Sequence, residues 1–270
     1  MIKLVATDMD GTFLTENHTY DKKRLAALLP KLKAKGIIFA VSSGRSLLAI
    51  EQLFADFLDD IALIAENGSL VQYQNQVIFA DFMTKKQYVE VAERILENPY
   101  YVETGMLFSG QKASYILEGA SQDYINRMHL FYENIKIISD FDEMDDDSIF
   151  KITTTFTGET VLDGSAWLDQ KIPYISAVTT GFESIDVILA EVNKGFGIAH
   201  LCQALDIKAE EVIAFGDNLN DYQMLEYVGQ AVATANARPE IIALADQVIG
   251  HCNEQAVLTY LEGLVSEDDL

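Results

Sequence analysis

Short apolar runs alternate with amphipathic stretches in the N-terminal part of the chain. The runs occupy residues 2–7, 37–41 and 61–65 and contain few polar positions. Uninterrupted runs of this length are typical of strands that are covered on both faces. Between the first two runs, residues 21–35 place leucines at helical spacing, and Gly36 follows them. This stretch predicts a helix that ends at a glycine.

A second amphipathic stretch, residues 47–57, separates the second apolar run from the third. The order strand, helix, strand, helix, strand favours right-handed crossovers and a parallel sheet with helices on both faces. A similar alternation of helical and strand-like stretches resumes at residues 195–205 and 212–215. The sequence therefore predicts an α/β fold with a Rossmann-like parallel-sheet core.

The middle of the chain departs from this order. After a hairpin expected at Gln74 and Asn75, the predicted elements follow one another in the mixed order of an α+β segment. The predicted strands span 100–108, 114–118, 135–138, 149–157, 175–179 and 184–189, and the predicted helices span 85–97, 122–132 and 159–168. We therefore expect a core domain of residues 1–83 and 191–270, into which an α+β domain of residues 84–190 is inserted. The final residues, 266–270, are expected to form a solvated tail.

The charge of the chain restricts its partners. The 270 residues carry a formal net charge of −23, and the sequence pI is near 4.3. Such a charge repels phosphate backbones and anionic membrane surfaces, so we expect no nucleic-acid and no membrane partner. The N-terminal residues do not resemble a secretory signal, and no stretch reaches the ~18 apolar residues of a membrane helix, which favours a cytoplasmic protein. The oligomeric state is not indicated.

Four polar clusters lie where the predicted core would bring them together. They are Asp8 with Asp10, Ser42 with Ser43, Lys194, and Asp217 with Asn218, Asn220 and Asp221. Three of the clusters follow the carboxyl ends of predicted strands, and Lys194 begins a predicted helix. Ligands bind beyond the carboxyl ends of the strands in open parallel sheets, so we expect these clusters to converge on one site.

Convergence of several carboxylates is costly, because like charges push one another toward protonation. A bound divalent cation removes this cost, and an all-oxygen ligand set points to a hard ion such as Mg²⁺. One carboxylate would then hold the metal and attack a substrate, while its neighbour would move protons.

Each cluster also has a simpler interpretation when it is taken alone. An Asp-x-Asp-Gly sequence is most often a solvated turn, and GDNLND at residues 216–221 could form a turn and a helix N-cap. Lys194 alone is an ordinary exposed lysine. Ser42 and Ser43 could cap the helix that follows them, which is the preferred interpretation of Ser42. The order of the clusters along the chain is more specific than any one of them.

In that order, residues 8–12 (DMDGT), Ser43, Lys194 and residues 216–221 resemble the four motifs of the haloacid dehalogenase-like hydrolases. Within that superfamily, the inserted segment, the ENG at residues 66–68 and the VNKG at residues 192–195 resemble the Cof-type phosphatases. TDMDGTFL, AENGSLV and TTGFESIDVIL are further similar to bacterial sugar phosphatases of this group. The resemblance implies a Mg²⁺-dependent phosphatase that acts on small phosphorylated metabolites, above all on sugar phosphates.

The resemblance also implies a role for each motif residue. Asp8 would attack phosphorus and become an aspartyl-phosphate, and Asp10 would protonate the leaving alcohol and then activate water. The side chains of Asp8 and Asp217 and the backbone carbonyl of Asp10 would hold Mg²⁺, while Asp221 would act through water or by orienting Lys194. The implied substrate contacts are Lys194, Ser43 and Asn220, with Arg45 and Asn67 as further candidates. The inserted domain would be a cap that determines specificity.

Two stretches depart from the family pattern. Ala235-Asn236-Ala237 lacks the glycine that relatives usually have before the asparagine, and Gln255-Ala256 replaces an acid–glycine pair. Both affect loop details rather than the four motifs. Two other functions stay open, a sugar phosphotransferase or mutase and a catalytically idle metal-binding regulatory module. The idle module is disfavoured because every motif residue with a chemical role is present.

Overall fold

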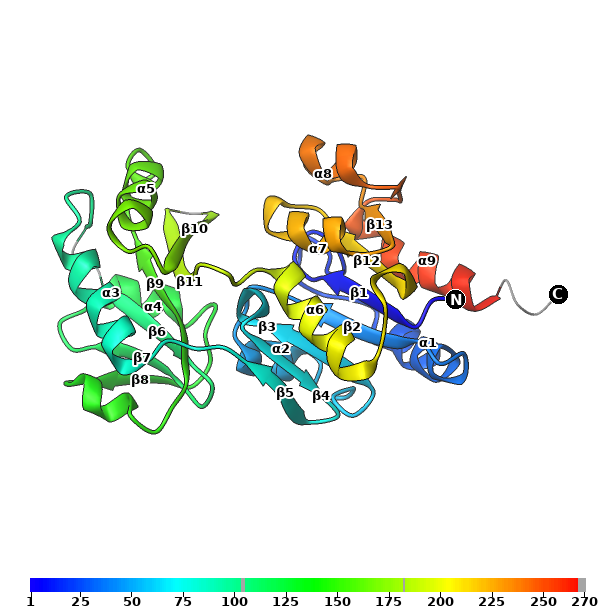
Figure 1. Ribbon diagram of the computed structural model, residues 1–270, viewed down its shortest axis with the longest axis horizontal. Helices are drawn as coiled ribbons and strands as arrows, with labels where there is room; N and C mark the ends of the chain where they lie inside the picture. Colours follow the sequence, from blue (N-terminus) through cyan, green and yellow to red (C-terminus); the bar gives the residue numbers. More distant parts are fainter. Residues whose placement is uncertain (103–104, 182, 267–270) are drawn as a thin grey trace. The chain divides into compact units, whose positions relative to one another are not determined.

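The computed structural model describes residues 1–102, 105–181 and 183–266, and the chain divides into two compact units (Figure 1). One unit combines Met1–Gly44, Phe54–Ala80 and Asn193–Leu270, and the other combines Arg45–Leu53 and Asp81–Val192. Each unit is built on a β-sheet of its own. None of the helices within the described ranges is both long and apolar enough to cross a membrane.

The first unit is built on a mixed sheet. Its strands are, in spatial order, β14 (Gln247–Val248), β13 (Gln230–Ala233), β12 (Val212–Gly216), β1 (Leu4–Asp8), β2 (Ile38–Ser42), β3 (Ile61–Ala65), β4 (Leu70–Tyr73) and β5 (Gln76–Ala80). Neighbouring strands from β14 to β3 are parallel, which confirms the predicted parallel core. The predicted hairpin at Gln74 and Asn75, whose φ angles are 51° and 59°, adds β4 and β5 in antiparallel orientation.

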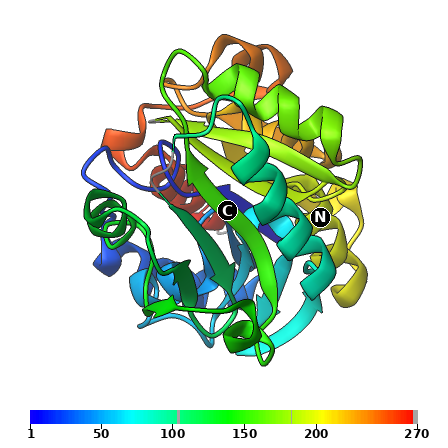
Figure 2. The same cartoon turned by 90° about the vertical axis from the view of Figure 1, so that its left-hand side faces the viewer.

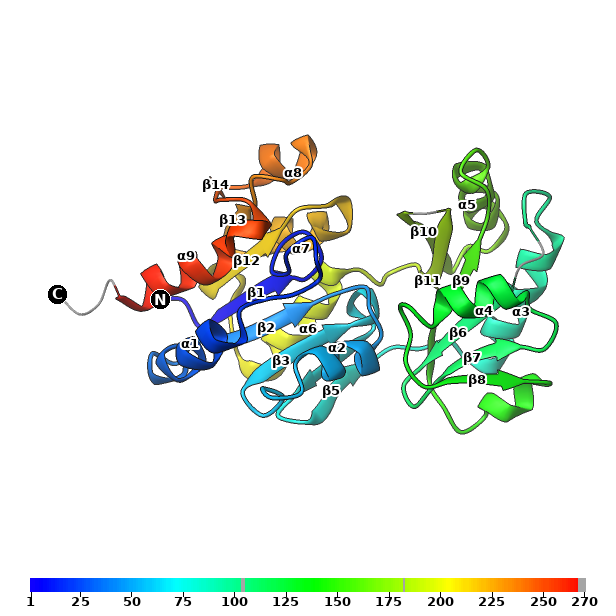
Figure 3. The ribbon, with the colours of Figure 1, turned by 180° about the vertical axis from the view of Figure 1, so that it is seen from behind.

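Helices cover both faces of this sheet. Those of the first unit are α1 (Lys22–Ala34), α6 (Lys194–Leu205), α7 (Tyr222–Tyr227), α8 (Pro239–Leu244) and α9 (Ala256–Ser266), with the short 3₁₀ turns η1 (Glu66–Gly68), η3 (Ala209–Glu211), η4 (Leu219–Asp221) and η5 (Cys252–Glu254). Ile198 and Leu201 of α6 belong to the same hydrophobic core cluster as Leu4 and Ala6 of β1. On the opposite face, α9 and α1 lie side by side, as seen from behind in Figure 3.

The local sequence explains where α1 begins and ends. The Asp21 side chain accepts hydrogen bonds from the backbone N–H groups of Lys23 and Arg24 at 3.0 and 3.1 Å, which caps the helix. Its four leucines are buried, and Gly36 follows with a φ of +71°. The predicted helix over 21–35 is therefore confirmed.

The second unit contains a sheet in the order β10 (Ile175–Gly181), β11 (Ser184–Leu189), β9 (Ile149–Thr155), β6 (Met106–Gly110), β7 (Ser114–Leu117) and β8 (Ile135–Ile138). Its helices are α2 (Leu47–Leu53), α3 (Lys85–Glu97), α4 (Gln122–Met128) and α5 (Val161–Lys171), with the 3₁₀ turn η2 (Phe141–Met144). Phe108 packs with side chains of α3 and α5, and the adjacent Leu107 packs with α4, so helices lie on both faces (Figure 2).

Several predicted boundaries were wrong. The helix predicted over 47–57 ends at Leu53, and the helix predicted over 122–132 ends at Met128. The strand predicted over 100–108 begins only at Met106, and its residues 103–104 lie outside the described residues, as does most of the expected tail. Beyond α2 the apolar pattern continues because the following turn buries Phe54 and Phe57. The apolar residues Leu130 and Phe131 after α4, and Tyr100 and Val102 before β6, are instead exposed.

Candidate active site

The three central strands of the first unit end beside one another. β1 ends at Asp8, β2 at Ser42 and β12 at Gly216, and Asp8 is paired in register with Ser42. Because β12, β1 and β2 are parallel neighbours, the residues that follow them emerge at the same edge of the sheet. The sequence expectation that the polar clusters meet at this edge is fulfilled for Asp8 and Asp217.

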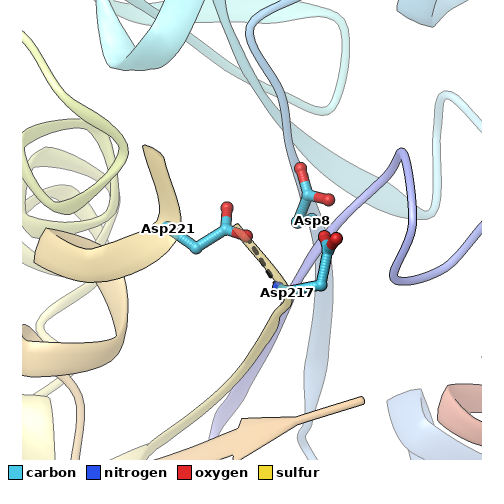
Figure 4. A group of neighbouring side chains, drawn as sticks. All are labelled: Asp8, Asp217 and Asp221. Carbon is cyan, nitrogen blue, oxygen red and sulfur yellow. Dashed lines mark hydrogen bonds between the residues drawn. The ribbon is translucent and has the colours of Figure 1, made fainter. Parts of the chain in front are cut away.

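Three carboxylates converge at this edge (Figure 4). Asp8, Asp217 and Asp221 each place one oxygen so that all three atoms lie within 4.8 Å of one another. Asp8 and Asp221 are buried, with 5 % and 0 % of their surface exposed, and Asp217 is partly buried. Three like charges in so small a buried space need compensation.

Lys194 supplies part of that compensation. Its Nζ donates hydrogen bonds to Oδ1 of Asp8 and, at 2.6 Å, to Oδ1 of Asp221. Burial lowers the pKa of Lys194, but the charges of Asp221 and Asp8 more than offset this effect, so the pKa lies above its ordinary value. The lysine therefore stays protonated. It begins α6, where the Asn193 side chain accepts a hydrogen bond from the Phe196 N–H at 2.9 Å.

One ammonium group does not neutralise three carboxylates. Burial and the charge of Asp221 hold the pKa of Asp8 well above its usual range, against the opposing effect of Lys194. Burial and Asp221 raise the pKa of Asp217 to about 6, although the Thr12 hydroxyl lowers it. A cation at this place would relieve the remaining repulsion. The donors are all carboxylate oxygens, which is the ligand chemistry that Mg²⁺ prefers, so these residues fit that ion.

Both carboxylate oxygens of Asp221 interact with other groups of the protein. One of its oxygens pairs with Lys194, and Oδ2 accepts hydrogen bonds from the backbone N–H groups of Asp217 and Asn218 at 2.9 and 3.0 Å. The carboxylate thus shapes the loop that carries Asp217 and orients Lys194. This leaves Asp8 and Asp217 as the two carboxylates best placed to contact a metal directly.

Gly11 and Thr12 take part in the site, and sequence reasoning gave neither of them a role. Thr12 Oγ1 donates to Asp217 Oδ1 at 2.8 Å. Gly11 has a φ of +85°, and its carbonyl accepts hydrogen bonds from the Asn236 side-chain amide at 2.7 Å and the Thr234 hydroxyl at 3.3 Å. Asn236 therefore anchors the Gly11 loop even though the glycine expected before it is absent. The DGT sequence was a signal for these contacts, but their partners follow only from the fold.

The loops after β2 and β3 are joined at the site. The Ser43 N–H donates to the Ile64 carbonyl at 2.8 Å, and the Ser43 carbonyl accepts from the Asn67 N–H at 3.0 Å. Both residues are buried, and Asn67 adopts a positive φ of 56° with its side chain against Gly44. Asn220 lies exposed in η4. Arg45 belongs to the other compact unit, and its contact with substrate stays a prediction.

The interpretation of Ser42 as a helix cap was wrong. Ser42 is the last residue of β2, and α2 begins only at Leu47. The hydroxyl that accepts from the first turn of α2 is that of Ser46, at 3.3 Å from the Ala49 nitrogen. The Ser42 Oγ is buried without a hydrogen-bond partner.

Comparison with known proteins places this site in a family. Residues 5–261 match the family model described as haloacid dehalogenase-like hydrolase. The chain is 31 % identical to 5-amino-6-(5-phospho-D-ribitylamino)uracil phosphatase YbjI of Escherichia coli, over 99 % of this chain and 97 % of that protein. It is 26 % identical to the HMP-PP phosphatase of Citrobacter koseri, over 97 % and 95 % of the two chains.

A solved structure agrees with these matches. SMU.1108c of Streptococcus mutans superimposes with a TM-score of 0.89 at 25 % identity, covering 98 % of this chain and 100 % of that one. The chain belongs to the haloacid dehalogenase-like hydrolases and, within them, to the Cof-type phosphatases. The family resemblance and the fold class that the sequence predicted are confirmed. At this level of description the chain is a phosphatase of small phosphorylated metabolites.

Proposed function

We propose that the chain is a Mg²⁺-dependent phosphatase that hydrolyses phosphate monoesters of sugars or sugar alcohols through an aspartyl-phosphate on Asp8. The observation that supports this best is the bridge that Lys194 makes between Asp8 and Asp221, with Asp217 in the same group of carboxylates. A buried carboxylate whose charge is partly compensated by a lysine, at the end of a central strand, is suited to nucleophilic attack once a cation balances the remaining charge.

The reaction has two displacements. The Asp8 carboxylate forms a bond to phosphorus while the bond from phosphorus to the substrate oxygen breaks, and Asp10 gives its proton to that leaving oxygen. Asp10, now a carboxylate, then takes a proton from a water molecule whose oxygen attacks the same phosphorus. The bond to Asp8 breaks, which releases inorganic phosphate and restores the Asp8 carboxylate and the protonated Asp10.

The metal would be held by the carboxylates of Asp8 and Asp217 and by the backbone carbonyl of Asp10. When bound, Mg²⁺ neutralises charge on the phosphoryl oxygens and orients them for in-line attack. Lys194 balances the remaining negative charge, and Asp221 keeps the lysine in place. Ser43 donates its hydroxyl to a phosphoryl oxygen, with Asn220, Asn67 and Arg45 as further substrate contacts.

The substrate class rests on two arguments. The relative YbjI is described as acting on a compound that carries a phosphorylated ribityl chain, which is a sugar alcohol phosphate. The negative charge of −23 disfavours polyanionic substrates such as nucleic acids. Residues 84–190 would form a cap that excludes water and contacts the leaving group, so specificity would depend on this segment.

Phosphate release from a panel of sugar phosphates, sugar alcohol phosphates, nucleotides and an aryl phosphate tests the proposal. Wild type and Asp8→Asn are compared with Mg²⁺ and with EDTA. Release that requires both Mg²⁺ and Asp8, and that is fastest with sugar or polyol phosphates, supports it. Transfer to a second sugar with little free phosphate would indicate a phosphotransferase instead. No turnover of any member, with no phosphate analogue trapped on Asp8, would indicate the idle module.

A further inference from the structure

His18 lies against the residue that the proposed mechanism uses for proton transfer. Its Nδ1 is 3.0 Å from Oδ1 of Asp10. Both side chains reach solvent, with 67 % of His18 and 42 % of Asp10 exposed. A carboxylate oxygen only accepts hydrogen bonds, so Nδ1 is the donor whenever Asp10 is ionised. In the sequence, His18 lies outside the four motif clusters.

The backbone around His18 is built to hold this contact. A bridge pairs Asp10 with Leu14, and the chain then turns back, with the Thr15 N–H donating to the Thr19 carbonyl at 2.9 Å and the His18 N–H donating to the Thr15 carbonyl at 2.8 Å. His18 itself has a φ of 55°. A positive φ is uncommon for a residue with a side chain, and such a conformation persists only where surrounding contacts hold the backbone in place.

The turn is also anchored to a distant part of the same unit. The Glu16 N–H donates to Asn253 Oδ1 at 2.9 Å, and Asn253 Nδ2 donates back to Glu16 Oε2 at 2.9 Å. Directly after the turn, the ring of Tyr20 stacks on Phe54 with centroids 5.0 Å apart. The position of His18 is therefore fixed from both sides of the turn, and it is not the chance position of a loose surface loop.

We propose that His18 is a positioning residue for Asp10, an inference that rests on the acid–base role proposed for Asp10. A donor on Oδ1 stops the carboxyl group from rotating and makes Oδ2 the oxygen that carries the transferable proton. In the first displacement, the proton on Oδ2 is then already directed at the leaving oxygen. The contribution matters most for substrates whose leaving group is a poorly stabilised alkoxide, since an aryl oxide departs without a proton.

The test compares three substitutions that all tolerate the positive φ. Asn keeps a side-chain N–H near the position of Nδ1, Asp replaces it by an oxygen that repels Asp10, and Gly removes the side chain. The measured quantity is the ratio of kcat/KM for the best alkyl phosphate of the panel to kcat/KM for para-nitrophenyl phosphate. This ratio covers only the steps up to departure of the leaving group, so hydrolysis of the aspartyl-phosphate does not enter it.

We expect His18→Gly to lower the ratio about fivefold, which is the size of one ordinary hydrogen bond. His18→Asp should lower it further, and His18→Asn should restore it to near the wild-type ratio. An unchanged ratio in the Gly and Asp variants overturns the inference. An equal fall in all three variants also overturns it, because the Asn variant keeps the N–H donor and should keep the ratio. Urea denaturation of each variant verifies that the fold is retained.

Asp10→Asn separates this inference from the proposed function. A fall in the same ratio for Asp10→Asn, with no further fall when His18→Gly is added, supports both assignments. A fall for Asp10→Asn alone, with His18→Gly at the wild-type ratio, overturns only the role of His18. No fall for Asp10→Asn overturns the acid–base role of Asp10 and the inference together.

Discussion

Gly11 and Asp217 approach so closely that no side chain fits between them. A Cβ placed on Gly11 would lie 2.5 Å from Oδ2 and 2.9 Å from Cγ of Asp217. The glycine is therefore part of the wall against which the proposed metal-binding carboxylate rests.

Gly11→Ala should displace the Asp217 carboxylate and weaken Mg²⁺ binding. We expect the Mg²⁺ concentration for half-maximal activity to rise about tenfold or more, because one of the two proposed carboxylate ligands is misplaced. The matched control is Gly36→Ala, since Gly36 also has a positive φ of +71° but would meet no atom within 4 Å. Both variants carry the same backbone strain of about 1 kcal/mol, so an equal Mg²⁺ requirement in the two would contradict this prediction.

Lys194→Met should destabilise the metal-free protein and make its stability depend on Mg²⁺. The substitution leaves two buried carboxylates without their cation, which costs about 3–5 kcal/mol of unfolding free energy. Lys151→Met is the control, because Lys151 is equally buried and pairs with Asp186 at 3.1 Å in the other unit. Denaturation with and without Mg²⁺ should show recovery for Lys194→Met only. The same Mg²⁺ response in both variants would refute the assignment of the metal to the Asp8 cluster.

The raised pKa of Asp217 determines the sign with which it makes the unfolding free energy depend on pH. Between the ordinary value of 3.8 and the folded value of about 6, the native state keeps a proton that the unfolded state has released. Asp217 therefore contributes a fall in unfolding free energy as pH rises through this window, and the loss persists above it. Asp8 acts in the same direction.

Urea denaturation of metal-free wild type and Asp217→Asn across this window tests the effect, because carboxylates outside the site act equally in both proteins. The substitution also removes a charge that raises the pKa of Asp8, so both carboxylates change the comparison in the same direction. The wild type should lose stability relative to the variant as pH rises, and saturating Mg²⁺ should reverse this loss. A difference between the two proteins that is constant with pH would show that Asp217 titrates normally.

Ser42→Ala should stabilise the protein. The Ser42 hydroxyl is buried and has no hydrogen-bond partner, and removing an unsatisfied group of this kind gains about 1 kcal/mol. Thr7→Val is the opposite control, because the equally buried Thr7 hydroxyl donates to the Asp8 carbonyl at 2.8 Å and its loss should be destabilising. Thermal or urea unfolding of both variants checks the two signs, and destabilisation by Ser42→Ala would mean that the hydroxyl has a partner in solution.

The sequence predicted the features that depend on local pattern. Buried strands read as apolar runs, the leucines of α1 lie between a capping aspartate and a glycine, and parallel strands bring their carboxyl ends to one edge. The meeting of Asp8 and Asp217 followed from that rule alone. The family motifs added Lys194, whose contact with Asp8 spans 186 positions of the chain.

What the sequence did not predict depends on contacts between distant loops. The closeness of Gly11 to Asp217, the bond from Thr12 to the same carboxylate and the contact of His18 with Asp10 each require the finished fold. Ser42 was misinterpreted because a serine before a helix is normally a cap, whereas here the strand extends through it. The end of α2 was predicted wrongly because apolar side chains produce the same sequence pattern whether a helix or a turn buries them.

The place of β1 in its sheet has a consequence for folding. β1 lies between β2 and β12, and the pairing of Leu4 with Val212 joins segments that are far apart in the sequence. Pairings so remote in sequence close late, because the entropy of a long loop is lost before any contact compensates it. During synthesis, β1 to β5 and the whole of the other unit leave the ribosome before β12 does. One edge of β1 therefore stays unpaired in the nascent chain, and Asp8 meets Asp217 only when β12 pairs with that edge.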